Sequence, residues 1–535
     1  MMSTGGEPAE DREVDGNNAE NPSAEENFCA SERDQGLFRA ASSCCRPPAG
    51  EMQDKPIGVG ILGATGVVGQ HFVSLLHGHP WFRVVAVGGS TRTAGLKYGE
   101  AIKWHLEDKT PLAALRDMEV LACDAKLFKA RGCALVFSAL TADVAGELEQ
   151  AFAEEGLWVF SNARNWRSAS CVPILLPLVN SEHLDIVPTQ TSYKKAGSGI
   201  ITNGNCASTG LAVALAPILR TWGIDRVVIA TLQACSGAGY PGESAMDMID
   251  NVVPHISGEE AKLGWEPQKI LGELKFSGRT NTAKNEGEAL PRKYAVTASD
   301  TAAPPGPDKA EPLIASTCGA LIEPAGFESY AMCHRVPVTE GHTMSVVVDL
   351  PAGAFPSTAC ALCVADAVER VIESYKPPDE VQRLPSCPQQ ALFVLDDATR
   401  PQPRLDRMQG AGMAVSVGPV KALFSRRLQV WMLKFTLLVH NTVLGAAGCS
   451  ILNAELALTR GLVQRYYKGH SLVPSQYMNS AREANIFIPS SKGRKTRKII
   501  RESAPTRKKH CQGHTTEAVA NKTFVPSKAF VESHK

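Results

Sequence analysis

The sequence lacks a long uncharged apolar run and an excess of charge of either sign, and we expect no N-terminal targeting signal. Its longest apolar stretch, residues 428–439, is interrupted by Lys434, so we expect no membrane-spanning helix. Lysine plus arginine number 55, as do aspartate plus glutamate, and this balance favours neither nucleic acid nor a membrane as a partner. The acidic, polar N-terminus is unlike a secretory signal or an arginine-rich transit peptide, so we expect a cytoplasmic protein.

A disulfide framework and a metal-ligand pattern are also missing. The 15 cysteines are scattered and odd in number, which is typical of reduced thiols. Cys360 and Cys363 are the only close pair on an apolar face, within a segment of helical periodicity, and no second pair completes a zinc site. We therefore expect both to be structural core residues, and we expect no bound metal.

Strand-like and helix-like apolar segments alternate through the middle of the chain. From residue 57 a buried strand runs into a glycine-rich turn, a helix and a second strand. This alternation predicts an α/β protein whose first domain is a Rossmann-type, doubly wound parallel sheet. The expected divisions are a disordered extension at 1–54, the dinucleotide-binding domain at 55–205, an α+β domain at 206–436 with an irregular excursion at 277–326, a helix at 437–464, and a basic, disordered tail at 465–535.

Three glycines, Gly63, Gly66 and Gly69, stand at the predicted turn between the first strand and the first helix. This spacing suits a tight turn and the close approach of a pyrophosphate to the helix N-terminus. An ordinary strand-to-helix turn is the alternative. The strand before the glycines and the helix after them favour a dinucleotide site.

The residues after the second predicted strand indicate which dinucleotide binds. NAD sites usually carry a carboxylate there, to hold the ribose hydroxyls. This chain instead has Ser90, Arg92 and Thr93. Hydroxyls and a cation suit a 2′-phosphate, so the sequence favours NADP over NAD, with a merely polar loop as the alternative.

Among the cysteines, Cys206 has the setting of a nucleophile. It follows a strand and the turn Asn203-Gly204-Asn205, and it opens a long apolar helix. The helix dipole and free N–H groups stabilise a thiolate at such a position. The same donors can stabilise the oxyanion of a tetrahedral intermediate. A dinucleotide fold with a cysteine nucleophile suggests an oxidoreductase that forms a thioester.

The chain also resembles a known family. The motifs that carry the resemblance occur in family order and span residues 57–462: GATGVVG, SNARNWR, NGNCAST, TLQACSGAGYPG, NVVPHISGEEAK, CHRVPVTEGHT, RPQPRLDR and HNTVLGAAGCSILNAE. Together they resemble aspartate-semialdehyde dehydrogenases, in particular the fungal and archaeal branch. The resemblance implies reversible, NADP-dependent reductive dephosphorylation of L-aspartyl-4-phosphate through a thioester on Cys206, in the biosynthesis of threonine, methionine and, where present, lysine.

The family's architecture is implied as well. In it the second domain is a catalytic and dimerisation domain, and the C-terminal helix returns to complete the Rossmann domain. A homodimer or homotetramer is therefore the expected assembly, with small-molecule substrates and phosphate as the other partners. The two ends of the chain and much of the polar excursion at 277–326 are not covered by the resemblance.

The resemblance assigns roles to further side chains. A lone histidine is usually structural, but His342 lies in the family's GHT motif and is implied as the acid/base beside the thiol. Gln233 is implied to orient the acyl group. The implied substrate ligands are Glu259 for the ammonium, Arg335 for the α-carboxylate, and Arg167 and Lys262 for phosphate. The neighbouring Arg164 and Asn165 could share the role of Arg167. The implied cofactor ligands are Gly63, Thr65, Gly66, Val67, Val68, Gly69, Ser90, Arg92 and Thr93, with Ser236, Gly237 and Asn441 near the nicotinamide.

The sequence departs from the family pattern at three positions near these motifs. His334 stands where asparagine is expected, Arg164 where lysine is expected, and Cys235 where an aliphatic residue is expected. The rival hypotheses are a related thioester-forming reductase, such as a malonyl-CoA reductase, and a non-catalytic regulatory homologue. Charged ligands for an amino acid argue against the first, and the retained Cys206–His342 pair argues against the second.

Overall fold

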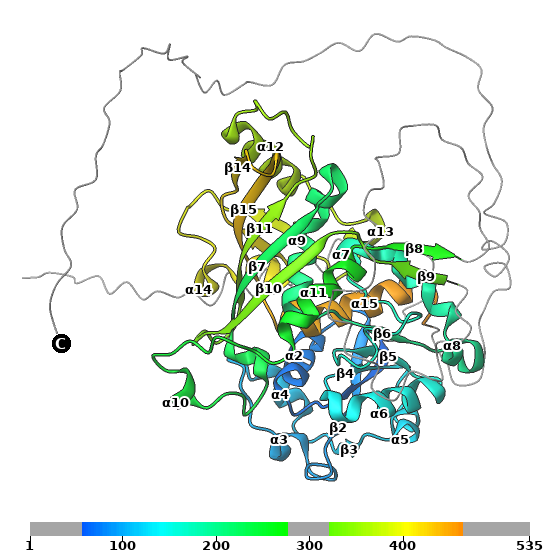
Figure 1. Ribbon diagram of the computed structural model, residues 1–535. Coiled ribbons are helices and arrows are strands. Elements are labelled where there is room, and N and C mark those ends of the chain that lie inside the picture. Colours follow the sequence, from blue (N-terminus) through cyan, green and yellow to red (C-terminus); the bar gives the residue numbers. More distant parts are fainter. Residues whose placement is uncertain (1–55, 277–319, 464–535) are drawn as a thin grey trace, which may run out of the picture. The chain divides into compact units, whose positions relative to one another are not determined.

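A computed structural model describes residues 56–276 and 320–463 (Figure 1). The extension predicted at 1–54 and the basic tail predicted at 465–535 lie outside the described residues. Most of the excursion predicted at 277–326 also lies outside them. Within its described part, residues 320–323 form strand β9 (Ala320–Glu323), which pairs antiparallel with β8 (Glu273–Phe276). The irregular segment was therefore predicted to extend too far, because the alternating burial of these four residues suits a strand.

The first sheet has six parallel strands in the order β3-β2-β1-β4-β5-β6. This is the doubly wound arrangement, in which the connections reverse direction between β1 and β4 and leave a crevice at the carboxyl ends of those strands. The Rossmann-type prediction is confirmed. The strands are β1 (Ile57–Leu62), β2 (Phe82–Gly89), β3 (Val120–Ala122), β4 (Leu135–Ser138), β5 (Trp158–Ser161) and β6 (Ile200–Thr202).

Helices connect these strands and leave most strand residues buried. Such near-continuous apolar strands are expected when helices cover a parallel sheet. The helices of this part are α2 (Val67–Leu76), α3 (Tyr98–Ala101), α4 (Thr110–Leu115), α5 (Ala125–Ala130), α6 (Ala142–Glu154), α7 (Pro177–Asn180), the 3-10 helix η1 (Ser181–Thr189) and α8 (Thr191–Ala196).

The second sheet is mixed and has seven strands, in the order β10-β7-β11-β15-β13-β12 with β14 beside β15. Helices α9 (Cys206–Trp222), α11 (Glu259–Ile270) and α12 (Ala361–Glu373) pack against its strands. This is the α+β part that the sequence predicted. The strands are β7 (Arg226–Gln233), β10 (Glu328–Arg335), β11 (His342–Asp349), β12 (Leu392–Val394), β13 (Val415–Val417), β14 (Lys421–Ser425) and β15 (Val430–Val439).

The last described helix packs against the first sheet. Strand β15 extends to Val439, so the helix predicted to begin at residue 437 begins later, with the π-helical turn η5 (Val443–Ala447) and then α15 (Gly448–Thr459). The alternating burial of residues 430–437 shows why they continue a strand. Helix α15 contacts β5 and α7, and Glu455 accepts a hydrogen bond from His79 at 2.8 Å.

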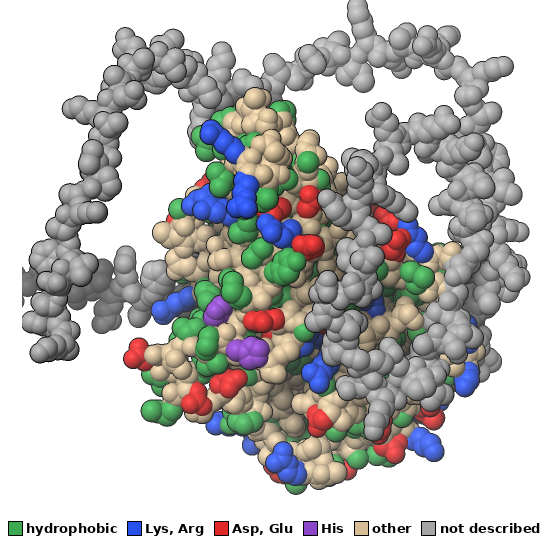
Figure 2. Space-filling view, in the orientation of Figure 1, with side chains coloured by type: hydrophobic (Ala, Val, Ile, Leu, Met, Phe, Trp, Pro, Cys, Tyr) green, Lys and Arg blue, Asp and Glu red, His purple; other side chains and the backbone are tan. Residues whose placement is uncertain are grey.

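Short helices fill the remaining connections: η2 (Cys235–Ala238), α10 (Ala245–Met248), α13 (Asp379–Gln382), α14 (Pro403–Asp406) and η4 (Gln409–Gly412). Within the described ranges, no helix combines the length and the apolar character needed to cross a membrane. On the face in Figure 2, acidic and basic side chains lie beside one another with hydrophobic side chains between them.

Candidate active site

The site is built around the first residue of α9. Asn205 caps this helix, because its Oδ1 accepts hydrogen bonds from the backbone N–H groups of Ala207 at 3.0 Å and Ser208 at 3.2 Å. The cap holds Cys206 at the start of the helix, where dipole and N–H groups point toward an incoming anion. The Sγ atom of Cys206 lies 3.1 Å from Nε2 of His342, the first residue of β11. The predicted nucleophile and histidine are thus in hydrogen-bonding contact.

The imidazole of His342 is held in one tautomer. The backbone N–H of Ala234 donates to its Nδ1 at 3.1 Å, so the neutral ring carries its proton on Nε2, the atom facing Cys206. Burial of the ring, together with the positive charge of Arg335, lowers the pKa of His342 to about 3. His342 is therefore a neutral hydrogen-bond donor toward the sulfur, and the same N–H can donate to an oxyanion formed on the acyl carbon.

Some neighbours of Cys206 favour ionisation of its thiol and others oppose it. Burial and the nearby carboxylate of Glu259 raise the pKa of the Cys206 thiol to about 12, while Lys262 and Arg167 oppose this rise. The isolated site thus holds a neutral thiol. A cation bound at Glu259 would cancel one of the two effects that disfavour the thiolate.

Glu259 is the centre of a buried polar cluster beside Cys206. It begins α11 and accepts hydrogen bonds from Asn205 Nδ2 at 2.8 Å and Gln233 Nε2 at 3.2 Å, and it forms an ion pair with Lys262. Burial opposes ionisation, but the Lys262 ammonium and these hydrogen bonds outweigh it and hold the pKa of Glu259 below its ordinary value. The structure thus brings Gln233, Glu259 and Lys262 together at the nucleophile.

Arg335 reaches the same place from the end of β10. It is buried, its Nη1 donates to the carbonyl of Ala234 at 2.9 Å, and its Nε–H donates no hydrogen bond among the described residues. A Cβ added at Gly237 would lie 3.0 Å from Arg335 Nη1 and 3.2 Å from His342 Nε2. The absence of a side chain at Gly237 therefore leaves room directly against Arg335 and His342.

Arg167 joins the site through a second carboxylate. Its Nη1 forms an ion pair with Glu266 at 3.0 Å, and the other oxygen of Glu266 accepts the backbone N–H of Asn205 at 2.5 Å. The Nε–H of Arg167 has no hydrogen-bond partner in the described part of the chain. Asn165 does not join this group, because its Nδ2 donates to the carbonyl of Ala142 at the start of α6.

The turn before His342 is tied to the first helix of the dinucleotide fold. Glu340 lies 3.0 Å from Nε2 of His71 on α2, 3.4 Å from Nε2 of His440, and accepts a hydrogen bond from Thr442 at 2.9 Å. Burial disfavours its charged form, but the hydrogen bond with His71 and the nearby His440 outweigh this and lower the pKa of Glu340 to about 2. This cluster fixes the turn relative to α2.

Asn441 adds a second tie to this turn. Its Oδ1 accepts the backbone N–H of Gly341 at 2.8 Å, and its Nδ2 donates to the hydroxyl of Ser236 at 2.8 Å. Ser236 and Gly237 lie in η2, directly after Ala234 and Cys235. The three residues predicted near the nicotinamide are therefore adjacent to His342.

The glycine turn lies between β1 and α2, at the carboxyl end of β1. Gly63 has a φ of 71°, and a Cβ there would lie 2.7 Å from the carbonyl oxygen of Ala139. At Gly69 a Cβ would lie 2.3 Å from the carbonyl oxygen of Gly63, whereas Gly66 meets nothing closer than 3.5 Å. Gly66 caps α2 without a side-chain hydrogen bond, and Thr65, Val67 and Val68 flank it. The free helix N-terminus and the open Gly66 fit a pyrophosphate.

The loop after β2 fits a phosphorylated ribose. Ser90 and Arg92 are exposed, and Thr93 folds back so that its N–H and hydroxyl both donate to the carbonyl of Ser90, at 2.9 and 3.1 Å. Among the described residues, no ion pair engages Arg92. A free guanidinium beside hydroxyls, with no carboxylate between residues 90 and 93, suits a 2′-phosphate better than a bare ribose.

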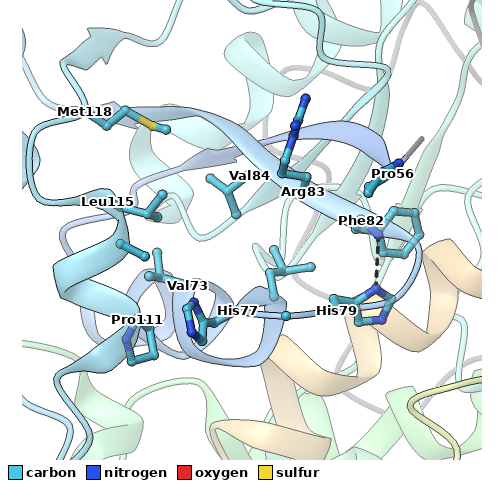
Figure 3. A pocket seen from close by; sticks show the side chains of 13 residues that line it. Pro56, Val73, His77, His79, Phe82, Arg83, Val84, Pro111, Leu115 and Met118 are labelled. Atoms are coloured by element: carbon cyan, nitrogen blue, oxygen red, sulfur yellow. Dashed lines mark hydrogen bonds between the residues drawn. The ribbon is translucent and has the colours of Figure 1, made fainter. Parts of the chain in front are cut away.

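A cavity of about 480 Å³ lies at the other end of the first sheet (Figure 3). It is formed by the end of α2, the start of β2 and helix α4, and the N–H of Phe82 donates to Nδ1 of His79 on its wall. Ligands of doubly wound folds bind at the carboxyl ends of the strands, and this cavity is at the amino ends. None of the predicted site residues lines it.

Several residues of the site escaped the sequence analysis. Asn205 could have been found, because asparagine before an apolar helix is a capping signal. Glu266 and Glu340 could not, since only the fold reveals that their partners are near. Gly445 is needed because a Cβ there would lie 2.8 Å from Cys206 Cβ. It sits in a π-helical turn that has no clear sequence signal.

The fold and the site together define a class: a nicotinamide-dependent oxidoreductase in which a cysteine and a histidine are in contact at the candidate active site. Comparison with known proteins agrees. Residues 58–187 match the family model "Semialdehyde dehydrogenase, NAD binding domain", and residues 215–288 and 315–443 match "Semialdehyde dehydrogenase, dimerisation domain".

Individual relatives narrow the class. Aspartate-semialdehyde dehydrogenase of Cryptococcus neoformans is 40% identical over 416 residues, covering 77% of this chain and all of the relative. The Archaeoglobus fulgidus protein of the same name is 38% identical, covering 76% and 99%. The Candida albicans enzyme, solved with NADP, superposes with a TM-score of 0.59 at 35% identity, covering 76% and 100%. This chain belongs to the aspartate-semialdehyde dehydrogenase family.

Proposed function

We propose that this protein catalyses the reversible, NADP-dependent reductive dephosphorylation of L-aspartyl-4-phosphate to L-aspartate 4-semialdehyde, through a thioester on Cys206. The reaction belongs to the biosynthesis of threonine and methionine and, where present, lysine. The observation that carries the proposal is the 3.1 Å contact between Cys206 Sγ and His342 Nε2 at the start of α9. A thiol in this position can form a covalent acyl intermediate and divide one difficult substitution into two steps.

The first step uses the charges around Cys206. The thiol proton of Cys206 passes to the phosphate group of the substrate as the sulfur attacks the acyl carbon. The tetrahedral oxyanion accepts a hydrogen bond from the Nε2–H of His342, and hydrogen phosphate leaves as the C–O bond breaks. The substrate ammonium at Glu259 lowers the electrostatic penalty on the thiolate, because Glu259 is one of the groups that raise the pKa of the Cys206 thiol. We assign activation of the nucleophile in part to the substrate itself.

The second step needs a hydride donor beside the thioester. When bound, NADPH supplies a hydride to the acyl carbon. Gly63, Gly66 and Gly69 with the N-terminus of α2 would hold the pyrophosphate, and Ser90, Arg92 and Thr93 the 2′-phosphate. Asn441, Ser236 and Gly237 would position the nicotinamide next to His342. The hemithioacetal oxyanion then re-forms the carbonyl as the C–S bond breaks, the aldehyde leaves, and the released Cys206 thiolate takes a proton from solvent.

The two ends of the amino acid and its phosphate have candidate ligands. Glu259 would receive the ammonium and Arg335 the α-carboxylate. The unpartnered Nε–H groups of Arg335 and Arg167 support roles in anion binding. Lys262 would contact phosphate while it remains paired with Glu259. Gln233, hydrogen-bonded to Glu259, would orient the acyl group.

A direct assay tests this function. The purified full chain is incubated with aspartate semialdehyde and NADP or NAD, with and without phosphate or arsenate. We expect NADPH formation that requires the anion. A dependence on coenzyme A instead of phosphate would favour a malonyl-CoA reductase. Loss of all activity in a folded, NADP-binding protein would favour a regulatory homologue.

Arg335→Leu should chiefly raise KM for aspartate semialdehyde. Removing one member of a buried charge-paired contact costs about 2–5 kcal/mol, with some loss of kcat if positioning suffers. Initial rates at saturating NADP and phosphate measure both constants. The control is Arg226→Leu, which removes a half-exposed arginine paired with Asp349 at the far end of β7. Equal KM values for the two variants would contradict the role of Arg335.

Arg92→Ala should weaken NADP binding by about 1.5–3 kcal/mol, the scale of a charged hydrogen bond, and hardly change NAD binding. Fluorescence titration with each cofactor measures the effect. Arg83→Ala is the matched control, because Arg83 is an exposed arginine at the opposite end of β2. Equal losses for NADP and NAD would show that Arg92 does not contact the 2′-phosphate.

We also propose that the protein is a homodimer through the open face of the second sheet. The register of β7 and β10 places Leu232, Tyr330 and Met332 on one face, with exposures of 43%, 56% and 55%. Sedimentation velocity should show that Tyr330→Glu with Met332→Glu dissociates the protein. Leu362→Glu, at an exposed position on α12, should leave the assembly intact.

The cytoplasm is the location we propose for this enzyme. Its site requires a reduced thiol, and none of the cysteines within the described ranges forms a disulfide.

A further inference from the structure

Two cysteines lie at the start of α12, away from the catalytic site. Cys360 is the residue that precedes the helix, with extended backbone angles of −72° and 129°, and Cys363 lies in its first turn. Both side chains are exposed, so the prediction of two core residues was wrong. The core-facing side of α12 consists of Val364, Ala365, Val368 and Ile372, which leaves Cys363 on the neighbouring, solvent-facing side.

The helix start makes Cys360 the more reactive of the pair. No side-chain hydrogen bond caps α12, and the Cys360 sulfur itself lies against the N–H groups of the first turn. Interactions with the backbone N–H groups of Cys363 and Leu362, and with the Cys363 side chain, lower the pKa of the Cys360 thiol, while Asp366 acts weakly in the opposite direction. Cys360 is the N-cap residue and Cys363 the third residue of α12, and side chains at these two positions face each other across the first turn. The Cys363 side chain is therefore within reach of Cys360, as the second thiol of a C-x-x-C pair must be.

The pair is remote from Cys206 and more accessible. Helix α12 packs against β14, and β14 pairs with residues 430–434 of β15, whereas His342 pairs with Val439 at the opposite end of that strand. Figure 1 shows α12 at the end of the second sheet away from α2. Every other cysteine in the described ranges is buried or half-buried. We therefore expect a thiol reagent in solution to react with Cys360 and Cys363 faster than with Cys206.

We propose that Cys360 and Cys363 form a redox-active dithiol that reacts with low-molecular-weight disulfides, separately from the catalytic Cys206. The Cys360 thiolate attacks one sulfur of the disulfide, whose S–S bond breaks, and the first thiolate leaves and takes a proton. Cys363 then loses its proton and attacks the Cys360 sulfur of the mixed disulfide, which expels the second thiolate. The dithiol loses two electrons and two protons, and the reagent is reduced to two thiols.

Glutathione redox buffers test the proposal on the full-length protein. After equilibration at graded ratios of glutathione disulfide to glutathione, the sample is quenched with acid and digested with trypsin. Residues 336–370 form one tryptic peptide that contains no cysteine besides these two. We expect this peptide to lose two hydrogens with a single midpoint. Cys123→Ser, which removes a half-buried thiol elsewhere, should leave that midpoint unchanged.

Single variants separate the roles of the two thiols. Cys363→Ser should accumulate a glutathione adduct on Cys360, about tenfold above the level in wild type, because no second thiol displaces it. Cys360→Ser should form the adduct on Cys363 more slowly. Both variants should keep dehydrogenase activity in reducing buffer. A wild-type peptide that stays reduced at every ratio, a disulfide to any other cysteine, or equal adduct rates in the two variants would overturn the proposal.

Discussion

Cys206→Ser should lower kcat for phosphate-dependent oxidation of aspartate semialdehyde by at least about 10⁴-fold, the scale of removing a covalent nucleophile. A serine hydroxyl is far less acidic than a thiol, and the neutral imidazole that already carries its proton on Nε2 does not act as its base. NADP binding should be retained, because the glycine turn and the loop after β2 do not include residue 206. Steady-state rates and a cofactor titration on the same preparation measure both effects.

The matched control is Cys235→Ser. Cys235 is also half-buried and lies one residue after Ala234, whose N–H holds His342, but its sulfur donates to the carbonyl of Val336 at 3.4 Å and does not contact the imidazole. This variant should remain active within a few-fold. If iodoacetamide inactivated the enzyme by modifying Cys235 while Cys206→Ser kept its activity, Cys206 would not be the nucleophile.

His342→Ala should lower kcat by about 10²–10⁴-fold with little change in KM, which is the range for removing a proton-transfer group or an oxyanion donor. The structure distinguishes these two roles. Because the Ala234 N–H occupies Nδ1 and the pKa of His342 is lowered to about 3, the ring acts as a neutral donor. His342→Gln keeps an N–H donor and should therefore retain more activity than His342→Ala.

Stopped-flow measurement of the chemical step in both variants tests this assignment. A glutamine variant as slow as the alanine variant would show that His342 must transfer a proton, and that its tautomer changes during the reaction. A change in KM alone would make His342 a binding residue. His440 would then be the next candidate for the proton, although its contacts are with Glu340 and Thr442.

Much of the fold followed from short-range patterns. The strand, glycine turn and helix at residues 57–76 repeat a local arrangement that needs no distant partner, and the structure has β1 and α2 there. Cys206 was identified for the same reason, since its turn and its helix adjoin it in sequence. Hydrophobic periodicity predicted burial less reliably at the ends of helices. Cys360 and Cys363 fit an apolar helix, but the core-facing side of α12 begins at Val364.

The remainder of the site depends on contacts between distant segments. Glu340 gains its partners from α2 and from the turn after β15, and Glu266 gains its partners from residues 167 and 205. The hydrophobic periodicity of one segment does not indicate which distant residues it will contact in the fold. The phosphate-binding role suggested for Asn165 came from its proximity in sequence to Arg167, whereas in the structure its Nδ2 donates to the carbonyl of Ala142. Site residues taken from the family pattern remain predictions until variants test them.

Trapping the acyl enzyme tests the central claim most directly. The full chain is mixed with aspartate semialdehyde and NADP in phosphate-free buffer, so that the thioester forms and has no phosphate to accept the acyl group. We predict a burst of NADPH equal to the number of subunits, and an aspartyl adduct on the tryptic peptide that contains Cys206, released when phosphate is added. The absence of a burst, or an adduct on any other residue, would contradict the account.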